Sequence, residues 1–198
     1  MIDGIIKHVK ENIIGRIADE GDSTRTLMEF VLLGGNGNHL EIGTLFGGSA
    51  ICVALMKIQA GFTGNLYCID PLDGYYMGTE YEKSVDPETQ LPIDIKTLTE
   101  NVERFGVSNR VIAWRKKSIP FPIPLDMRFS TAYIDGDHWG ENPLIDIVNA
   151  SMVTSKFIIV DNYDDKHPDV IKACKMADWL PNWKIVHING ITCVLGRK

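Results

Sequence analysis

The sequence predicts an α/β fold: a Rossmann-like, mostly parallel sheet of seven strands with helices on both faces and a C-terminal antiparallel hairpin. Short apolar runs, typical of buried strands, alternate along the chain with segments of helical spacing, which is the pattern of βα units. The pair Asn189-Gly190 separates the last two apolar runs. It is a strong signal for a two-residue hairpin turn, because both positions of such a turn favour positive φ.

The elements follow from these patterns in order. A first helix is predicted by apolar residues at helical spacing: Ile5, Ile6, Val9, Ile13, Ile14 and Ile17. A second helix is expected over residues 23–33, with Ser23 as its cap and the glycines at 34–37 as its stop. Further helices are predicted at residues 47–60, 93–105, 143–150 and 168–179. Strands are predicted at residues 39–44, 65–70, 111–115, 130–135, 157–161, 184–188 and 191–195.

At 198 residues the chain suits a single domain, residues 1–198, whose first 38 residues form N-terminal helices. Residues 73–92 lack periodicity and contain glycine, proline, acids and Tyr75, Tyr76, Met77 and Tyr81. A loop of this length is usually functional or disordered. It is either a lid that supplies stacking surfaces for a substrate or a mobile acidic loop, and both interpretations stay open.

Composition limits the partners. The net charge is −6 and there is no long basic run, so we expect no nucleic-acid binding. The start of the chain lacks the features of a signal peptide, and no apolar stretch approaches membrane-spanning length. The four cysteines are dispersed among apolar residues, as expected of reduced thiols in a cytoplasmic protein. We therefore expect a cytoplasmic protein with a small-molecule substrate; a homo-oligomer stays open.

Acidic residues stand at the ends of four predicted strands. These are Glu41, Asp70, Asp135 and Asp161, the last followed by Asn162. In open α/β sheets, ligands bind beyond the carboxyl ends of the strands, where the strand order reverses. One such acid is unremarkable, because Asp commonly forms turns and caps helices. Four strands that end alike are harder to explain by capping and indicate a ligand site.

The most informative stretch is residues 39–49. Glu41 ends a short apolar run, Gly43 follows, and Gly47-Gly48 open a helix that begins near Ser49. A strand that breaks into a glycine-rich turn brings backbone close to a nucleotide-like ligand. A pyrophosphate loop would avoid the negative charge of Glu41, because its helix N-terminus holds an anion. Glu41 suits a ligand with positive charge and hydroxyls, such as S-adenosylmethionine.

With these residues the chain resembles the class I S-adenosylmethionine-dependent methyltransferases, and among them the small metal-dependent O-methyltransferases, over roughly residues 39–195. The resemblance implies that Glu41 lies near the amino group of the methionine part, and that Gly43 and Gly47 let backbone approach the cofactor. Ser49 would bind the carboxylate, and two further residues complete the set: Asp70 for the ribose hydroxyls and Ser118 beside the adenine.

The same resemblance implies a divalent metal at Asp135, Asp161 and Asn162, with Asp135 bordering both cofactor and acceptor. Two carboxylates and an amide are oxygen ligands that suit Mg²⁺, with Ca²⁺ or Mn²⁺ as alternatives. The alternative interpretation is that Asp161 and Asn162 only turn the chain and cap the next helix.

His138 lies three residues after Asp135, at a place where catechol-type relatives carry a lysine base and some sugar O-methyltransferases carry histidine. A neutral imidazole can remove a hydroxyl proton near pH 7, so we expect His138 and Asp135 to be catalytic. Asp137 is a further ligand or an orienting group for His138. The competing interpretation is that His138 is a surface hydrogen-bonding group.

The resulting hypothesis is metal-assisted O-methylation of a small hydroxylated molecule: a sugar, a natural product or a catechol-like compound. One rival is a non-catalytic protein that keeps the cofactor-binding fold. A nicotinamide-dependent oxidoreductase is a weaker rival, because Thr44 and Leu45 follow Gly43 and the expected Gly-x-Gly-x-x-Gly is absent.

Overall fold

The computed structural model of the chain describes residues 1–18, 22–76, 82–83 and 85–198. Its main sheet has seven strands: β1 (His39–Ile42), β2 (Leu66–Asp70), β5 (Val111–Arg115), β6 (Phe129–Ile134), β7 (Thr154–Val160), β8 (Trp183–Asn189) and β9 (Thr192–Arg197). Their order is β5-β2-β1-β6-β7-β9-β8. Only β9 runs antiparallel to its neighbours, β7 and β8. The strand order reverses between β1 and β6, as expected of a doubly wound sheet.

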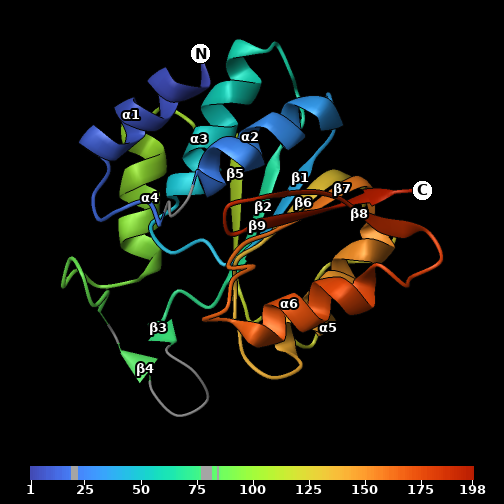
Figure 1. Cartoon of the computed structure of the whole chain (residues 1–198). Coiled ribbons are helices and arrows are strands. Elements are labelled where there is room, and N and C mark those ends of the chain that lie inside the picture. The colour runs from blue at the N-terminus through green and yellow to red at the C-terminus, as the bar shows by residue number, and fades with distance from the viewer. Residues whose placement is uncertain (19–21, 77–81, 84) are drawn as a thin grey trace.

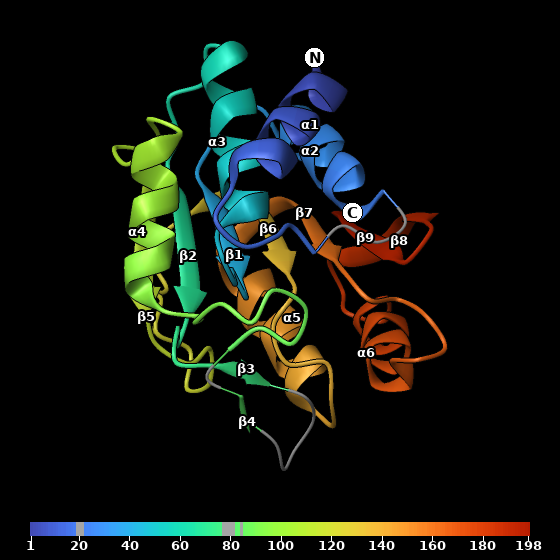
Figure 2. The ribbon, with the colours of Figure 1, turned by 90° about the vertical axis from the view of Figure 1, so that its left-hand side faces the viewer.

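In the described part of the chain, six helices cover the two faces of this sheet: α1 (Ile2–Asn12), α2 (Ser23–Gly34), α3 (Gly48–Gln59), α4 (Ile95–Arg104), α5 (Asn142–Val153) and α6 (Pro168–Ala177). Apolar residues of α1 to α4 join one buried cluster with residues of the sheet, and those of α5 and α6 join another. Figures 1 and 2 show these two groups of helices on either side of the strands. The predicted fold class is therefore confirmed.

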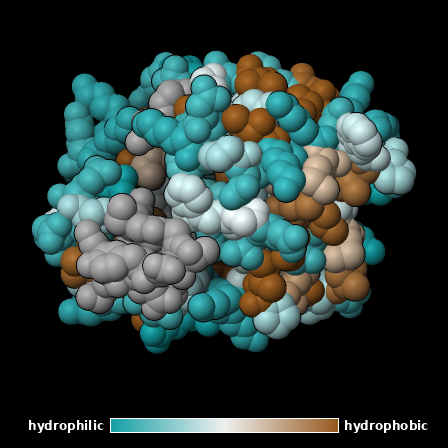
Figure 3. All heavy atoms as spheres, turned by 60° about the horizontal axis from the view of Figure 1, so that its bottom comes forward, coloured by the Kyte–Doolittle hydropathy of each residue, from teal (hydrophilic) through white to brown (hydrophobic). Residues whose placement is uncertain are grey.

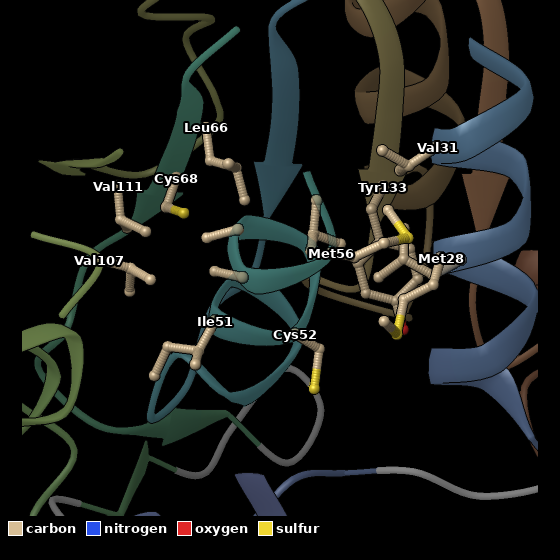
Figure 4. Packing of buried hydrophobic residues seen from close by; sticks show 14 of the residues in the cluster. Met28, Val31, Ile51, Cys52, Met56, Leu66, Cys68, Val107, Val111 and Tyr133 are labelled. Carbon is tan, nitrogen blue, oxygen red and sulfur yellow. The ribbon is translucent and has the colours of Figure 1, made fainter. Parts of the chain in front are cut away.

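The cluster under α1 to α4 contains one large polar side chain. Figure 4 shows Tyr133 of β6 beside Met28 of α2, with Met56 of α3 close by. The Tyr133 ring is 1 % exposed, and its hydroxyl donates a hydrogen bond to Asp161 Oδ2 at 2.7 Å. A buried hydroxyl requires such a partner. The core on this face therefore connects directly to an acid at the end of β7.

The predicted first helix is wrong at its C-terminal end. The helix stops at Asn12, Ile13 is extended with ψ 144°, and Gly15 has φ 97°. Ile13 and Ile17 keep helical spacing with the helix but pack against the same core cluster from the non-helical segment that follows it. Positive φ at Gly15 is compatible with glycine and not with a continuing right-handed helix.

Two local predictions also need correction. Ser23 is the first residue of α2 and not its cap, because Asp22 occupies the cap position in a left-handed conformation. The hairpin between β8 and β9 is confirmed, but its turn is formed by Gly190 and Ile191. Asn189 still pairs with Thr192, and its amide donates a hydrogen bond to Thr26 Oγ1 at 3.0 Å. This contact with α2 keeps Asn189 in the strand.

Residues 73–92 hold two short antiparallel strands, β3 (Tyr75–Tyr76) and β4 (Glu82–Lys83). Figures 1 and 2 place both beyond the carboxyl ends of the central strands. A bridge between Val85 and Pro92 closes the C-terminal part of the segment. Met77 and Tyr81 lie outside the described residues, and a lid function stays a prediction.

The four cysteines are all buried, and none forms a disulfide among the described residues, as the sequence indicated. Within the described ranges, no helix is both long and apolar enough to cross a membrane.

The glycine turn after β1 predicts a loss of stability when Gly43 is replaced. Gly43 has φ 84°, and a Cβ there would lie 2.0 Å from the carbonyl oxygen of Asp135. This atom belongs to the backbone and cannot rotate away. We expect Gly43→Ala to lower the free energy of unfolding by about 4 kcal/mol or more, measured by denaturant titration.

Gly61 provides the matched control, because it also has positive φ (71°) but its Cβ would meet nothing within 4 Å. Gly61→Ala should cost only the left-handed conformation, about 1–2 kcal/mol. Equal losses in the two variants would show that the contact with Asp135 does not constrain the fold.

Candidate cofactor and acceptor site

A cavity of about 560 Å³ opens at the carboxyl ends of the parallel strands. Its lining includes residues that follow β1, β2, β5, β6 and β7. It therefore lies at the position where the strand order reverses, which is where such sheets bind ligands. Figure 3 views the molecule from this end, and its surface mixes hydrophilic residues with separate hydrophobic patches.

Eight of the ten site residues named from the sequence line this cavity: Gly43, Ser49, Asp70, Ser118, Asp135, His138, Asp161 and Asn162. The other two, Glu41 and Gly47, are not in its lining. Glu41 is fully buried behind it. A Cβ on Gly47 would lie 2.4 Å from Leu98 Cδ1, so Gly47 provides space for α4.

Asp70 holds the glycine turn that follows β1. Its Oδ2 accepts hydrogen bonds from the backbone N–H of Thr44 (2.7 Å) and Leu45 (3.1 Å), and its Oδ1 accepts one from Leu72 (2.7 Å). Burial raises the pKa of Asp70, and these three donors only partly oppose that effect. Asp70 therefore joins the ends of β1 and β2, and ribose binding stays a prediction for its remaining lone pairs.

Glu41 makes a short polar network under the turn. Its Oε1 accepts hydrogen bonds from Ser49 Oγ at 2.9 Å and Thr44 Oγ1 at 3.2 Å. Its Oε2 is buried and has no hydrogen-bond partner among the described residues. Burial raises the pKa of Glu41 to about 8, although both hydroxyls favour the charged form. An unsatisfied buried oxygen is costly and suits a ligand cation.

Asp135 and Asp161 lie at the ends of the paired strands β6 and β7. Burial, followed by the charge of Asp135, raises the pKa of Asp161 to about 7, against a hydrogen bond from Tyr133. Asp161 Oδ1 is buried without a partner in the described part of the chain. Two carboxylates that repel each other and an unsatisfied oxygen suit a cation.

Asn162 follows directly, in the left-handed conformation with φ 57°. Among the described residues, no group of three or more His, Cys, Asp or Glu side chains forms a metal site. A metal here would depend on the two carboxylates and the Asn162 amide.

His138 Nε2 lies 3.3 Å from Asp135 Oδ1, without the alignment of a hydrogen bond. Burial acts to lower the pKa of His138, but Asp135, with Asp161 and Asp137, outweighs it and raises the pKa above its usual value. His138 is only 22 % exposed, so the interpretation as a surface group is not supported.

His167 was given no site role from the sequence, yet it lines the cavity. Its ring meets that of His138 edge to face, with centroids 5.1 Å apart, and the Trp139 ring is 5.9 Å away. Asp164 Oδ1 lies 3.0 Å from His167 Nδ1 and fixes this ring. In the sequence, His167 is marked only by its position directly before Pro168, where α6 begins.

Two further features of the site were not predicted from the sequence: the N-terminal wall, which is the part of the cavity lining formed by residues 16–18, and a buried acid. Arg16, Ile17 and Ala18 line the cavity, although they were expected in or beyond the first helix. Asp146 of α5 is 1 % exposed, and neither of its carboxylate oxygens has a hydrogen-bond partner among the described residues. Burial raises the pKa of Asp146 to about 7. The glycine at position 15 was the available sequence signal that the first helix ends before residues 16–18.

Solved structures with this architecture include O-methyltransferases. The O-methyltransferase NovP matches all of this chain and 98 % of its own, with a TM-score of 0.75 and 14 % identity. An O-methyltransferase from Bacillus cereus in complex with S-adenosylhomocysteine matches all of this chain and 90 % of its own, at a TM-score of 0.64 and 16 % identity.

TomG from Streptomyces achromogenes, an O-methyltransferase in complex with S-adenosylmethionine, matches 99 % of this chain and 88 % of its own, at a TM-score of 0.64 and 15 % identity. No protein-family model matches the sequence, and no curated protein matches it significantly. The chain therefore has the fold of the class I S-adenosylmethionine-dependent O-methyltransferases.

The buried carboxyl group of Glu41 predicts a pH dependence of the ligand-free protein. Burial raises its pKa to about 8 in the folded chain, against 4.5 for an ordinary glutamate, so folding favours the protonated form. The resulting stability is fully present below pH 4.5 and is lost as the pH rises through about 8. Glu41→Gln removes this loss. The free energy of unfolding of Glu41→Gln, relative to that of the wild type, should therefore increase as the pH is raised from 5 to about 8.

The measurement is denaturant unfolding at several pH values in the absence of ligand. Glu29→Gln, at an exposed position on α2, is the control and should run parallel to the wild type. A constant difference between Glu41→Gln and the wild type across this range would contradict the assignment.

Proposed function

We propose that this chain transfers the methyl group of S-adenosylmethionine to a hydroxyl group of a small molecule, with a divalent metal at the acceptor. The observation that carries the proposal is the meeting of Asp70, Ser118, Asp135, His138 and Asp161 around one cavity at the reversal of the strand order. The shared fold supports it, because the structures it matches include O-methyltransferases with the cofactor or its product bound.

The reaction needs one proton acceptor and a fixed geometry. The acceptor oxygen attacks the methyl carbon, the bond from carbon to sulfur breaks, and its electron pair stays on sulfur in S-adenosylhomocysteine. His138 takes the hydroxyl proton, and Asp135, 3.3 Å from Nε2, stabilises the imidazolium that forms. Because the sulfonium is already an activated donor, positioning by the cavity accounts for much of the acceleration.

The metal part of the proposal rests on the acids themselves. Asp135, Asp161 and Asn162 offer oxygen ligands, and Asp161 Oδ1, which has no hydrogen-bond partner in the described ranges, can accept a cation. Mg²⁺ keeps several waters and needs few protein ligands, so two carboxylates and an amide suffice. A divalent cation held there would make the acceptor hydroxyl more acidic. Tyr133, which donates to Asp161 Oδ2, orients that carboxylate.

The cofactor assignment has a direct binding test. S-adenosylhomocysteine should raise the melting temperature, because a ligand of the native state stabilises it by mass action. Asp70→Ala should weaken this binding about tenfold or more in calorimetry, because it removes the charged acceptor for the ribose hydroxyls. Asp73→Ala, at an exposed position three residues further on, is the control. Unchanged affinity in Asp70→Ala would exclude the ribose assignment.

The metal and base assignments need an accepted hydroxyl substrate. Chelation should abolish methyl transfer and leave S-adenosylhomocysteine binding largely intact, because the metal holds the acceptor and not the donor. Asp161→Ala should behave like chelation. His138→Ala should lower turnover by about 10²-fold or more, the scale expected for loss of a general base.

Turnover and Mg²⁺ affinity of each variant are the measurements, with His187→Ala on exposed β8 as the control. Mg²⁺ affinity should be nearly unchanged in His138→Ala if the imidazole is a base. Full activity in chelator removes the metal from the mechanism, and full activity in His138→Ala removes the base. Binding of the cofactor without transfer to any hydroxyl would favour a non-catalytic protein of this fold.

A further inference from the structure

We infer that Arg16 binds the carboxylate of the methionine part of S-adenosylmethionine, in exchange for Glu88, the surface carboxylate that it holds in this structure. This inference rests on the proposed function, because it assigns a residue to one end of that cofactor. Three features carry it: the place of Arg16 beside α3, the direction of the Ser49 hydroxyl, and the way in which two carboxylates hold the guanidinium.

The segment that carries Arg16 is fixed against the start of α3. The buried amide of Asn101 on α4 accepts a hydrogen bond from Ile14 N and donates to the carbonyl oxygens of Ile14 and Phe46, all at 2.9 Å. Ile17 packs so closely on α3 that a Cβ on Gly48 would lie 3.2 Å from its Cα. Arg16 therefore borders the first turn of α3 and lines the same cavity as Ser49.

The first turn of α3 is suited to an anion but lacks a side-chain donor for it. The N-cap is Gly47, and no side-chain cap hydrogen bond is present. The backbone N–H groups and the helix dipole at such an end favour negative charge. Ser49, the residue expected to bind the carboxylate, instead donates its hydroxyl hydrogen to Glu41 Oε1. A hydroxyl has one hydrogen to donate, so Ser49 does not supplement these N–H groups with a side-chain donor, and a cationic side chain nearby is suited to do so.

The Arg16 guanidinium is already oriented. Its Nε and Nη2 lie 3.0 and 2.9 Å from Asp86 Oδ2. Asp86 is fully buried and also accepts hydrogen bonds from the backbone N–H groups of Glu88 and Thr89. Burial alone would raise the pKa of Asp86, but the bonds from Arg16 and Thr89 outweigh it and hold the pKa below its usual value. Asp86 is therefore a fixed, charged anchor for Arg16.

The second carboxylate is the one that can be exchanged. Arg16 Nη1 lies 3.1 Å from Glu88 Oε1, whose side chain is 65 % exposed, against 17 % for that of Arg16. Exposed ion pairs contribute little free energy, so replacing Glu88 costs little. A planar guanidinium can bind one carboxylate with one edge and another with its opposite edge. Arg16 can therefore keep Asp86 on one edge and take the ligand carboxylate in place of Glu88 on the other.

The test compares two ligands that differ only at this end: S-adenosylhomocysteine, and 5′-methylthioadenosine, which lacks the amino-acid group. Dissociation constants are measured by calorimetry on the whole chain. Arg16→Ala should weaken S-adenosylhomocysteine about 10- to 100-fold, the scale of a lost hydrogen bond between charged groups, and change 5′-methylthioadenosine less than about twofold. Arg104→Ala on α4, which is outside the cavity lining, is the matched control and should change neither ligand.

A second variant tests the exchange in a protein that keeps Arg16. Glu88→Gln removes the competing carboxylate, so it should tighten S-adenosylhomocysteine about two- to fivefold and leave 5′-methylthioadenosine unchanged. Equal weakening of both ligands in Arg16→Ala would make Arg16 a purely structural residue and overturn the inference, as would unchanged or weaker S-adenosylhomocysteine binding in Glu88→Gln. If the wild type binds neither ligand, the proposed function itself fails and the inference fails with it.

Discussion

The structure depends on the close approach of the backbone after β1 to the backbone after β6. Gly43 leaves no space for a Cβ beside the Asp135 carbonyl, so the two strand ends meet at the point where the sheet reverses. Asp70 secures the same turn from the other side through the N–H groups of Thr44 and Leu45. Three neighbouring strands are thereby held in register at their carboxyl ends, and the cavity acids occupy fixed positions.

Burial changes the protonation and the hydrogen bonding of these acids. Glu41 and Asp161 each keep one buried oxygen without a partner in the described part of the chain, and burial raises the pKa of both. A protein that only needed stability would pair such groups or replace them with apolar residues. Asp161 lines the cavity, so its unsatisfied oxygen there indicates a cationic ligand, which agrees with a divalent metal.

Much of this could be predicted from sequence, because it depends on local signals. The alternation of strands and helices is a local pattern, and so is an acid at the end of a strand. The parallel topology then brings these strand ends, with their acids, to the same edge of the sheet. The N-terminal wall could not be predicted in the same way. Ile13 and Ile17 have helical spacing, but they pack against the core cluster from a non-helical segment, and only Gly15 marked the break. The contact of His167 with His138 depends on how α6 packs, and no short sequence pattern encodes it.

The place of β9 has a consequence for synthesis of the chain. It follows β8 in sequence but lies between β7 and β8 in the sheet. Until the ribosome has released β9, β7 presents an open edge and β8 has no strand to join. Open strand edges pair readily with other chains, so the nascent protein is exposed to aggregation at this stage. The sheet becomes continuous only when β9 enters between strands that were already made.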